Sequence, residues 1–238
     1  MKSNELEQMK GFAQKQSVVI VAGGKGLRAG GELPKQFCEI GGKPMLIHTI
    51  EAFRRFDDRM LIVLVLPEMH LSLWEKIRQE YCFETPVTLA IGGETRFHSV
   101  KSGLENVPDD CIVGVHDAAR PFVSQRIIEE SYRVARKFRC GAIPVIGEKN
   151  SIRLASKDGS EPIDRSRIKI VQTPQVFPAK LLKDAYRVDY RADFTDDASV
   201  AEKAGIRLQL IEGDELNFKI TTPLDMDIGR LIFRKSAK

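Results

Sequence analysis

The sequence predicts an α/β fold, with a mixed, mostly parallel sheet between two layers of helices and a projecting β-hairpin arm. Short apolar runs alternate with helical patterns along the chain, as in sheets whose parallel strands are joined by crossover helices. The runs are continuously apolar, which is typical of strands covered on both faces. One polar segment in the second half breaks the alternation. These observations describe a three-layer, Rossmann-like domain with an insertion.

Four apolar runs are predicted as strands. Residues 18–21 read Val-Val-Ile-Val and lead directly into glycines. Residues 60–66 read Met-Leu-Ile-Val-Leu-Val-Leu, a run too uniformly apolar for a strand with one solvent-exposed face. Residues 111–115 and 141–146 are the other two runs. We therefore expect these strands near the centre of the sheet.

Amphipathic patterns between these runs predict helices. Residues 45–56, 69–79 and 124–138 repeat apolar side chains every three or four positions, as a helix with one buried face does. Ser124 is a residue type that caps helix N-termini, so the third helix is expected to begin just after it. The helices would cover the sheet from both sides.

A polar segment, residues 150–172, is predicted to form the arm. Asp158-Gly159 lies between two alternating segments, which is a hairpin signal. A two-stranded hairpin is barely stable alone, so we expect it to pack on a second subunit. The predicted organisation is an N-terminal extension, residues 1–16, and a single domain, residues 17–238, in which the polar segment is a dimerisation arm.

Composition and charge favour a small anionic partner. The 37 basic and 33 acidic residues leave a net charge of +4, which is too small and too dispersed for nucleic acid as the main partner. No apolar stretch approaches the roughly 18 residues of a membrane helix, and the polar start lacks the pattern of a secretory signal, so no membrane partner is expected.

The four cysteines form no CxxC motif, and Cys111 and Cys140 each open an apolar run. Reduced, mostly buried thiols are expected, which fits a cytoplasmic location.

A glycine-rich loop follows the first predicted strand and carries two cations. It reads Ala22-Gly23-Gly24-Lys25-Gly26-Leu27-Arg28, and Pro34-Lys35-Gln36 comes shortly after it. Glycines allow backbone amides to approach phosphate oxygens, and Arg28 and Lys35 would neutralise a pyrophosphate leaving group in the transition state. The loop has neither the dinucleotide-binding glycine spacing nor a Walker sequence. Two interpretations stay open: a triphosphate loop, or a glycine-rich turn with two solvated charges.

A second glycine pair precedes a helical pattern that ends near Leu104. Residues 92–100 read Gly-Gly-Glu-Thr-Arg-Phe-His-Ser-Val. Backbone groups beside the glycines and the hydroxyl of Ser99 would accept from the exocyclic amine of cytosine and donate to its carbonyl. The alternative is an ordinary strand-to-helix turn.

Asp117 follows the predicted buried strand at residues 111–115. An acidic residue at the carboxyl end of a central strand lies where ligands bind in open α/β sheets. Asp117 would either hold Mg²⁺, directly or through water, or orient hydroxyl groups of a substrate, and Arg120 would bind an anionic group. The alternative is a buried Asp117–Arg120 pair that only shapes the loop.

The motifs together resemble one enzyme family. Ala-Gly-Gly-x-Gly-x-Arg followed by Pro-Lys-Gln resembles the nucleotidyltransferases that activate sugars and polyols. With His116-Asp117-Ala118-Ala119-Arg120-Pro121 included, the chain resembles the 2-C-methyl-D-erythritol 4-phosphate cytidylyltransferases of the non-mevalonate isoprenoid pathway. The resemblance runs from about residue 18 to residue 233, and its further strings are Asp164-Arg165, Thr173-Pro174-Gln175, residues 195–199 and the strand-like residues 217–221.

This resemblance implies transfer of CMP from CTP to 2-C-methyl-D-erythritol 4-phosphate, by direct in-line attack of the acceptor phosphate and with Mg²⁺ bound to CTP. The implied catalytic residues are Arg28, Lys35, Arg165 and Lys219. The implied substrate-binding residues are Ala22, Gly23, Gly24, Gly93, Glu94, Ser99, Asp117, Ala118, Arg120, Ser151, Thr173 and Thr195. Ser151 and Arg165 would reach from the arm into the site of the partner subunit of a homodimer. No protein ligand of the metal is assigned.

Alternative functions stay open. A sister enzyme that uses ribitol 5-phosphate or another polyol phosphate would share nearly every motif, and an enzyme that transfers GMP or UMP belongs to the same superfamily. A nucleotide-binding module without activity would not need Arg28, Lys35, Asp117 and Lys219 together. A dinucleotide-dependent oxidoreductase would need the missing glycine spacing. Because direct transfer forms no covalent intermediate, the four histidines are expected to be structural.

Overall fold

A central sheet organises the computed structural model, which describes residues 15–23 and 33–236. Its eight strands are β1 (Gln16–Val21), β4 (Leu61–Leu66), β5 (Thr88–Ile91), β6 (Ile112–Asp117), β7 (Gly141–Gly147), β10 (Lys169–Val171), β11 (Gln175–Pro178) and β12 (Leu208–Glu212). The order across the sheet is β10-β7-β11-β6-β1-β4-β5, and β12 also pairs with β7. Strands β6, β1, β4 and β5 are parallel neighbours, as are β12 and β7, whereas β10 and β11 run antiparallel to their neighbours. The sheet is therefore mixed and mostly parallel, as predicted.

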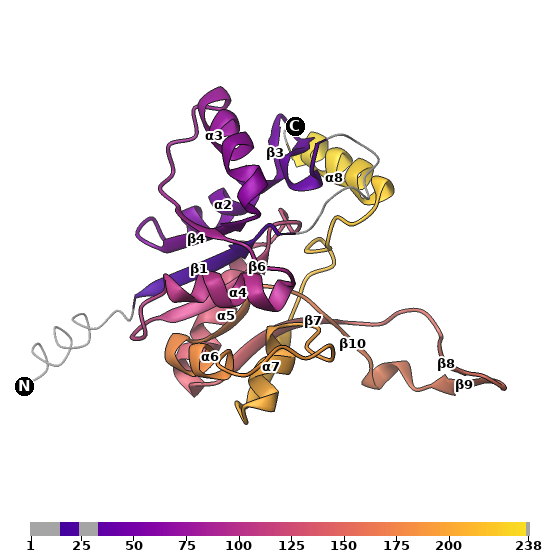
Figure 1. Cartoon of the computed structure of the whole chain (residues 1–238). Helices are drawn as coiled ribbons and strands as arrows, with labels where there is room; N and C mark the ends of the chain where they lie inside the picture. The colour runs from indigo at the N-terminus through magenta and orange to yellow at the C-terminus, as the bar shows by residue number, and fades with distance from the viewer. Residues whose placement is uncertain (1–14, 24–32, 237–238) are drawn as a thin grey trace, which may run out of the picture.

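Helices cover both faces of this sheet (Figure 1). They are α2 (Met45–Phe56), α3 (Leu71–Glu80), α4 (Arg96–Glu105), α5 (Gln125–Phe138), α6 (Ala179–Ala185), α7 (Asp197–Lys203) and α8 (Pro223–Ser236). Side chains alternate between the two faces along a strand. Val18 and Ile20 of β1 therefore share a hydrophobic cluster with residues of α2 and α5, whereas Val19 shares one with residues of α4 and α6.

The four strands and three helices predicted from apolar runs and amphipathic patterns are confirmed, with ends shifted by up to two residues. Helix α2 covers residues 45–56, and β4 begins at Leu61, one residue later than predicted. Only the first residue of β4 is not fully buried, which explains its continuous apolar run. The hydroxyl of Ser124 accepts a hydrogen bond from the backbone N–H of Ile127, at 3.4 Å, and caps α5.

Some elements gave no clear signal in the sequence. Strand β5 lies at the edge of the sheet and has only four residues, one of them buried, so its apolar run is too short to predict a strand. Helices α6 and α7 have seven residues each, about two turns, which is too short to establish a period. The strand-like interpretation of residues 217–221 is wrong: this segment is irregular, and the N–H of Ile220 donates to the carbonyl of Ala119 instead of joining a strand ladder.

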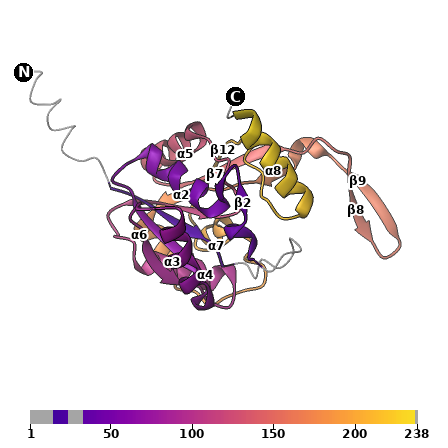
Figure 2. The ribbon, with the colours of Figure 1, turned by 90° about the horizontal axis from the view of Figure 1, so that it is seen from above.

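The arm is an antiparallel hairpin of β8 (Ile152–Ser156) and β9 (Gly159–Ile163), and it extends away from the body of the molecule (Figures 1 and 2). Ser156 pairs with Gly159, so the turn residues are Lys157 and Asp158 rather than the predicted Asp158-Gly159. The short 3₁₀ helix η4 (Arg165–Arg167) follows. Residues 169–171 then return to the central sheet as β10, so the arm ends earlier than predicted.

Helix α8 packs on a second small hairpin. Strands β2 (Glu39–Ile40) and β3 (Lys43–Pro44) pair with each other, and α8 packs against them in a third hydrophobic cluster. The 3₁₀ helices η2 (Lys35–Phe37) and η3 (Glu68–His70) precede β2 and α3. Strand β1 begins at Gln16, the last residue of the predicted extension, whose residues 1–14 lie outside the described part. Among the described helices, none has the length and apolar character needed to cross a membrane.

Candidate active site

Strands β1, β4, β5 and β6 run in one direction, so the segments that follow them meet at one edge of the sheet. Directly after β1, the N–H of Ala22 donates to the carbonyl of Val65, at 2.9 Å. The side-chain amide of Gln36 donates to the carbonyl of Ala22, at 3.0 Å, which ties the Pro-Lys-Gln segment to the start of the glycine-rich loop. Gly24 and Arg28, both predicted in this loop, lie outside the described residues.

Lys35 contacts the segment that contains Lys219, although the two lysines are far apart in the sequence. The ammonium group of Lys35 donates to the carbonyl of Ile220, at 2.8 Å. That carbonyl belongs to the residue next to Lys219. Two of the predicted catalytic cations are therefore attached to one segment, beside the edge of the sheet where phosphates are expected.

A compact turn brings together residues that were predicted to bind the substrate near its cytosine. The hydroxyl of Ser99, buried in the first turn of α4, accepts from the N–H of Gly93 at 3.2 Å and donates to the carbonyl of Thr95 at 2.9 Å. A side chain at Gly23 would place its Cβ 3.2 Å from this hydroxyl, so the glycine allows the loop after β1 to lie close to α4. Glu94 is exposed beside them. The structure thus brings Gly23, Gly93 and Ser99 together.

A cavity of about 280 Å³ lies next to this turn. Its lining residues are Arg96, Asp117, Arg120, Val171, Gln172, Thr173, Gln175, Thr195, Asp196 and Lys219. Five of the predicted site residues are in this set. Ala118, also predicted, is buried behind it, where its carbonyl accepts from the hydroxyl of Thr49 at 3.0 Å.

Asp117 is the centre of charge in this cavity. Its carboxylate oxygens lie 2.8 Å from Nζ of Lys219, 3.3 Å from Nε of Arg96 and 3.8 Å from Nε of Arg120. Burial alone would raise the pKa of this carboxyl, but the three cations hold it well below its usual range. Asp117 is therefore ionised and fixed, and it holds the cations where an anionic ligand would meet them.

Arg96 is a site residue that the sequence analysis did not single out. Its guanidinium binds both carboxylate oxygens of Asp197, at 3.0 and 2.7 Å, in addition to its contact with Asp117. Asp197 is fully buried and also accepts from the hydroxyl of Tyr186, at 2.7 Å. Arg96 stands in the string of residues 92–100 and Asp197 in that of residues 195–199, but their pairing joins positions 101 residues apart, which local patterns do not reveal.

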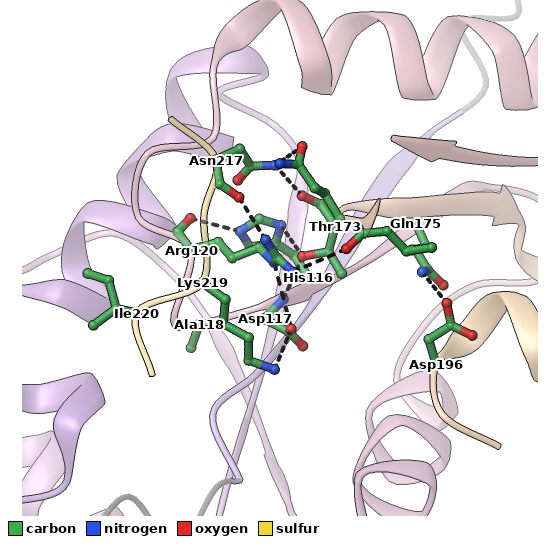
Figure 3. A network of polar contacts seen from close by, with 12 residues as sticks. His116, Asp117, Ala118, Arg120, Thr173, Gln175, Asp196, Asn217, Lys219 and Ile220 are labelled. Atoms are coloured by element: carbon green, nitrogen blue, oxygen red, sulfur yellow. Dashed lines mark hydrogen bonds and ion pairs between the residues drawn. The ribbon is translucent and has the colours of Figure 1, made fainter. Parts of the chain in front are cut away.

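Thr173, His116 and Arg120 form a continuous hydrogen-bonded chain (Figure 3). The hydroxyl of Thr173 lies 3.1 Å from the N–H of Asp117 and 3.0 Å from Nδ1 of His116. Nε2 of His116 lies 3.1 Å from the carbonyl of Arg120. Burial lowers the pKa of His116 to about 4, so its ring is neutral at ordinary pH. His116 is buried beneath the site and does not line the cavity.

The side-chain amides of Asn217 and Gln175 hold the remaining wall of the cavity in place through hydrogen bonds (Figure 3). The side chain of Asn217 donates to the carbonyl of Thr173 at 2.9 Å, and Arg120 donates to the carbonyl of Asn217 at 2.7 Å. Gln175 donates to Asp196 at 2.8 Å and accepts from the N–H of Ala198 at 2.7 Å. These bonds fix the loop before α7, in which Thr195 is exposed to the cavity.

The two predicted arm residues do not line the cavity of their own chain. Ser151 is exposed at the start of the hairpin. Arg165 is also exposed, and its guanidinium donates to the carbonyl of Lys149 at 2.6 Å. The structure therefore separates this pair from Asp117 and Lys219 within one chain. In the described part of the chain, no three His, Cys, Asp or Glu side chains gather in a metal-binding group.

A mixed α/β sheet with a glycine-rich first loop and a cation-lined cavity at one edge defines a nucleotidyltransferase-like protein. The sequence model of the family "IspD: 2-C-methyl-D-erythritol 4-phosphate cytidylyltransferase" matches residues 16–235. The chain belongs to this family.

Individual relatives agree with this assignment. A 2-C-methyl-D-erythritol 4-phosphate cytidylyltransferase from Bacteroides thetaiotaomicron is 50% identical over 215 residues, which cover 90% of this chain and 98% of the relative. A protein of the same name from Porphyromonas gingivalis is 42% identical, with coverage of 92% and 98%. The solved structure of the cytidylyltransferase from Thermus thermophilus has a TM-score of 0.72 at 28% identity, with coverage of 92% and 99%.

Proposed function

We propose that this protein transfers CMP from CTP to 2-C-methyl-D-erythritol 4-phosphate and releases 4-diphosphocytidyl-2-C-methyl-D-erythritol and pyrophosphate. The observation that carries this proposal is the adjacency of two sites at one edge of the sheet. The turn of Gly93 and Ser99 suits a cytosine, and the neighbouring cavity offers an ionised carboxylate, a hydroxyl and fixed cations to a polyol phosphate. The names of the relatives agree with this chemistry.

The reaction is a single in-line displacement. A phosphate oxygen of the acceptor forms a bond to the α-phosphorus of CTP while the bond from this phosphorus to the β-phosphate bridge oxygen breaks. Lys219 holds the incoming phosphate against the α-phosphate, and Lys35 and Arg28 offset the charge that develops on pyrophosphate. Placement and charge neutralisation supply the catalysis, so no covalent intermediate is required.

A magnesium ion would enter with CTP. Magnesium in nucleotide sites takes most of its oxygen ligands from phosphates and water and needs few protein carboxylates. This suits the cavity, because the carboxylate of Asp117 is already bound to three cationic side chains and would contact the ion through water. When bound, the ion lowers the mutual repulsion of the phosphates.

The active unit is a homodimer in which each arm completes the site of the other subunit. A hairpin that extends from the body without support from the described residues of its own chain needs a second surface. Ser151 and Arg165 lie on this arm, outside the cavity of their own chain, so only a partner could offer them to the acceptor phosphate. The four free cysteines suit a reducing compartment such as the cytoplasm.

The proposal is tested by pyrophosphate release from CTP and Mg²⁺ with a panel of polyol phosphates, including methylerythritol 4-phosphate and ribitol 5-phosphate side by side. We expect methylerythritol 4-phosphate to give the highest kcat/KM, and GTP or UTP to replace CTP poorly. A higher kcat/KM with ribitol 5-phosphate would move the assignment to the sister activity. Absence of acceptor-dependent release would contradict an enzymatic function.

A further inference from the structure

The hydroxyl of Thr173 is held between a fixed donor and a histidine. The backbone N–H of Asp117, 3.1 Å away, can only donate, so the oxygen of Thr173 accepts this hydrogen bond. On its other side, the same oxygen lies 3.0 Å from Nδ1 of His116. The direction of this second bond depends on which nitrogen of His116 carries the proton.

The far side of His116 settles that direction. Its Nε2 lies 3.1 Å from the backbone carbonyl of Arg120, and a carbonyl only accepts hydrogen bonds. Nε2 must therefore carry a proton. The ring is fully buried, and burial disfavours its charged form. A neutral ring has one proton, so Nδ1 is bare, and Thr173 donates its hydroxyl proton to Nδ1.

In this arrangement, the hydroxyl of Thr173 can only accept a hydrogen bond from a ligand. Its single proton is committed to His116, and one of its two lone pairs accepts from Asp117. One lone pair remains, on a residue that lines the cavity. We propose that His116 is a positioning residue that makes Thr173 a hydrogen-bond acceptor, so that Thr173 selects a hydroxyl group of the acceptor substrate and not its phosphate. This inference rests on the proposed function, which supplies the polyol phosphate.

The charged groups of the cavity support this distinction between the hydroxyl groups and the phosphate of the acceptor. The ionised carboxylate of Asp117 beside Thr173 is also acceptor-only, whereas Lys219 and Arg120 can only donate. A polyol phosphate carries both kinds of partner, hydroxyl donors and a phosphate acceptor. The cavity therefore offers groups that match each kind of partner.

Packing prevents the histidine and the threonine from reorienting. The ring of Phe53 meets that of His116 edge-on, with the centroids 4.9 Å apart. The carbonyl of Thr173 accepts from the amide of Asn217, at 2.9 Å. Both ends of the His116–Thr173 bond are thus held by groups outside the cavity.

Nitrogen-15 NMR of the histidine rings tests the proton positions in the unmodified protein. The chain has four histidines, so the ring signals can be assigned by single substitutions. We expect a bare Nδ1 and a protonated Nε2 for His116 near neutral pH. A protonated Nδ1 would overturn the inference, because Thr173 would then be free to donate.

Substrate analogues test the consequence for recognition. For each hydroxyl of the acceptor, one analogue lacks it and another replaces it with fluorine, which cannot donate. At the hydroxyl that meets Thr173, both analogues should lower kcat/KM by about tenfold, mainly through the acceptor KM. Thr173→Val should remove this penalty and thereby identify the position. If no fluorinated analogue shows a penalty that Thr173→Val removes, the inference is contradicted.

Two matched substitutions separate positioning from general structure. His116→Phe keeps a ring against Phe53 but releases the proton of Thr173, so the penalty for the fluorinated analogue should shrink to below about threefold. His48→Phe is the control, because His48 also forms a hydrogen bond with a carbonyl, that of Ile40, and packs on an aromatic ring. In this variant the kcat/KM penalty for the fluorinated analogue should stay unchanged. An unchanged penalty in folded His116→Phe would overturn the inference.

The experiments also distinguish failure of this inference from failure of the proposed function. Turnover of the parent acceptor with CTP by the wild-type enzyme tests the function alone. The NMR result needs no substrate, and it needs no variant of His116 because the other three histidines can be assigned by substitution. Turnover together with a protonated Nδ1 would contradict only the role of His116.

Discussion

Asp117 determines the charge balance of the cavity at the scale of single residues. A buried carboxylate without partners would cost several kcal/mol, and here Arg96, Arg120 and Lys219 offset that cost. In return, the carboxylate helps to hold three cationic side chains in a defined place. The cavity also contains Asp196, and Arg96 is bound to Asp197, so the three cations do not outnumber the nearby carboxylates. A phosphate would bind through direct contact with Lys219 and Arg120.

Lys35 gives the most direct test of catalysis at this scale. We expect Lys35→Ala to lower kcat by about 100-fold or more, on the order of 2.7 kcal/mol, because a fixed cation is lost where pyrophosphate gains charge. Steady-state kinetics at saturating CTP measures this effect. Lys43→Ala is the control, since Lys43 is an exposed cation nearby that pairs with Glu51. Near-normal turnover of Lys35→Ala would remove Lys35 from the mechanism.

The sequence predicted single site residues better than their partners. Asp117, Arg120, Thr173, Thr195 and Lys219 meet in one cavity, as their place in the motifs suggested. Contacts that bring distant segments together were not visible, above all the pairing of Arg96 with Asp197. Motif order shows which residues carry chemistry, but the fold alone decides which of them touch.

At the scale of elements, the hairpin of β8 and β9 has a different character from the rest of the molecule. Most of its residues are exposed, and its ladder pairs only its own two strands. Alternation and the Asp158-Gly159 pair made the hairpin predictable, although its turn lies one residue earlier than predicted. The end of the arm was not predictable, because residues 169–171 resemble the arm in sequence but complete the central sheet beside β7.

Hybrid dimers test the role of this arm. Arg165→Met should raise the acceptor KM, and Lys219→Ala should lower kcat. When the two variants are mixed and allowed to exchange subunits, each hybrid contains one site with both an intact Arg165 and an intact Lys219. We therefore expect activity above that of either variant alone, measured as product formed after exchange.

The control for this experiment is each variant carried separately through the same exchange procedure. Native mass spectrometry would establish that hybrids form. A mixture in which hybrids are present and activity does not rise would refute a site shared between subunits.

At the scale of the whole molecule, two hydrophobic layers hold the sheet so that its carboxyl edge can serve as the site. Val18, Val19 and Ile20 point alternately into the two layers, and the chain leaves β1 directly into the glycine-rich loop. This architecture was predictable because buried parallel strands leave continuous apolar runs. The short helices α6 and α7 and the edge strand β5 were not, since their patterns are too brief to establish a period.

A crystal structure with CTP and Mg²⁺ in the absence of acceptor tests the central claim most directly. The account predicts the cytosine beside Gly93 and Ser99, the triphosphate along the loop after β1 within reach of Lys35, and the cavity around Asp117 left for the acceptor. A nucleotide bound away from this edge of the sheet, without contact to Lys35, would contradict it.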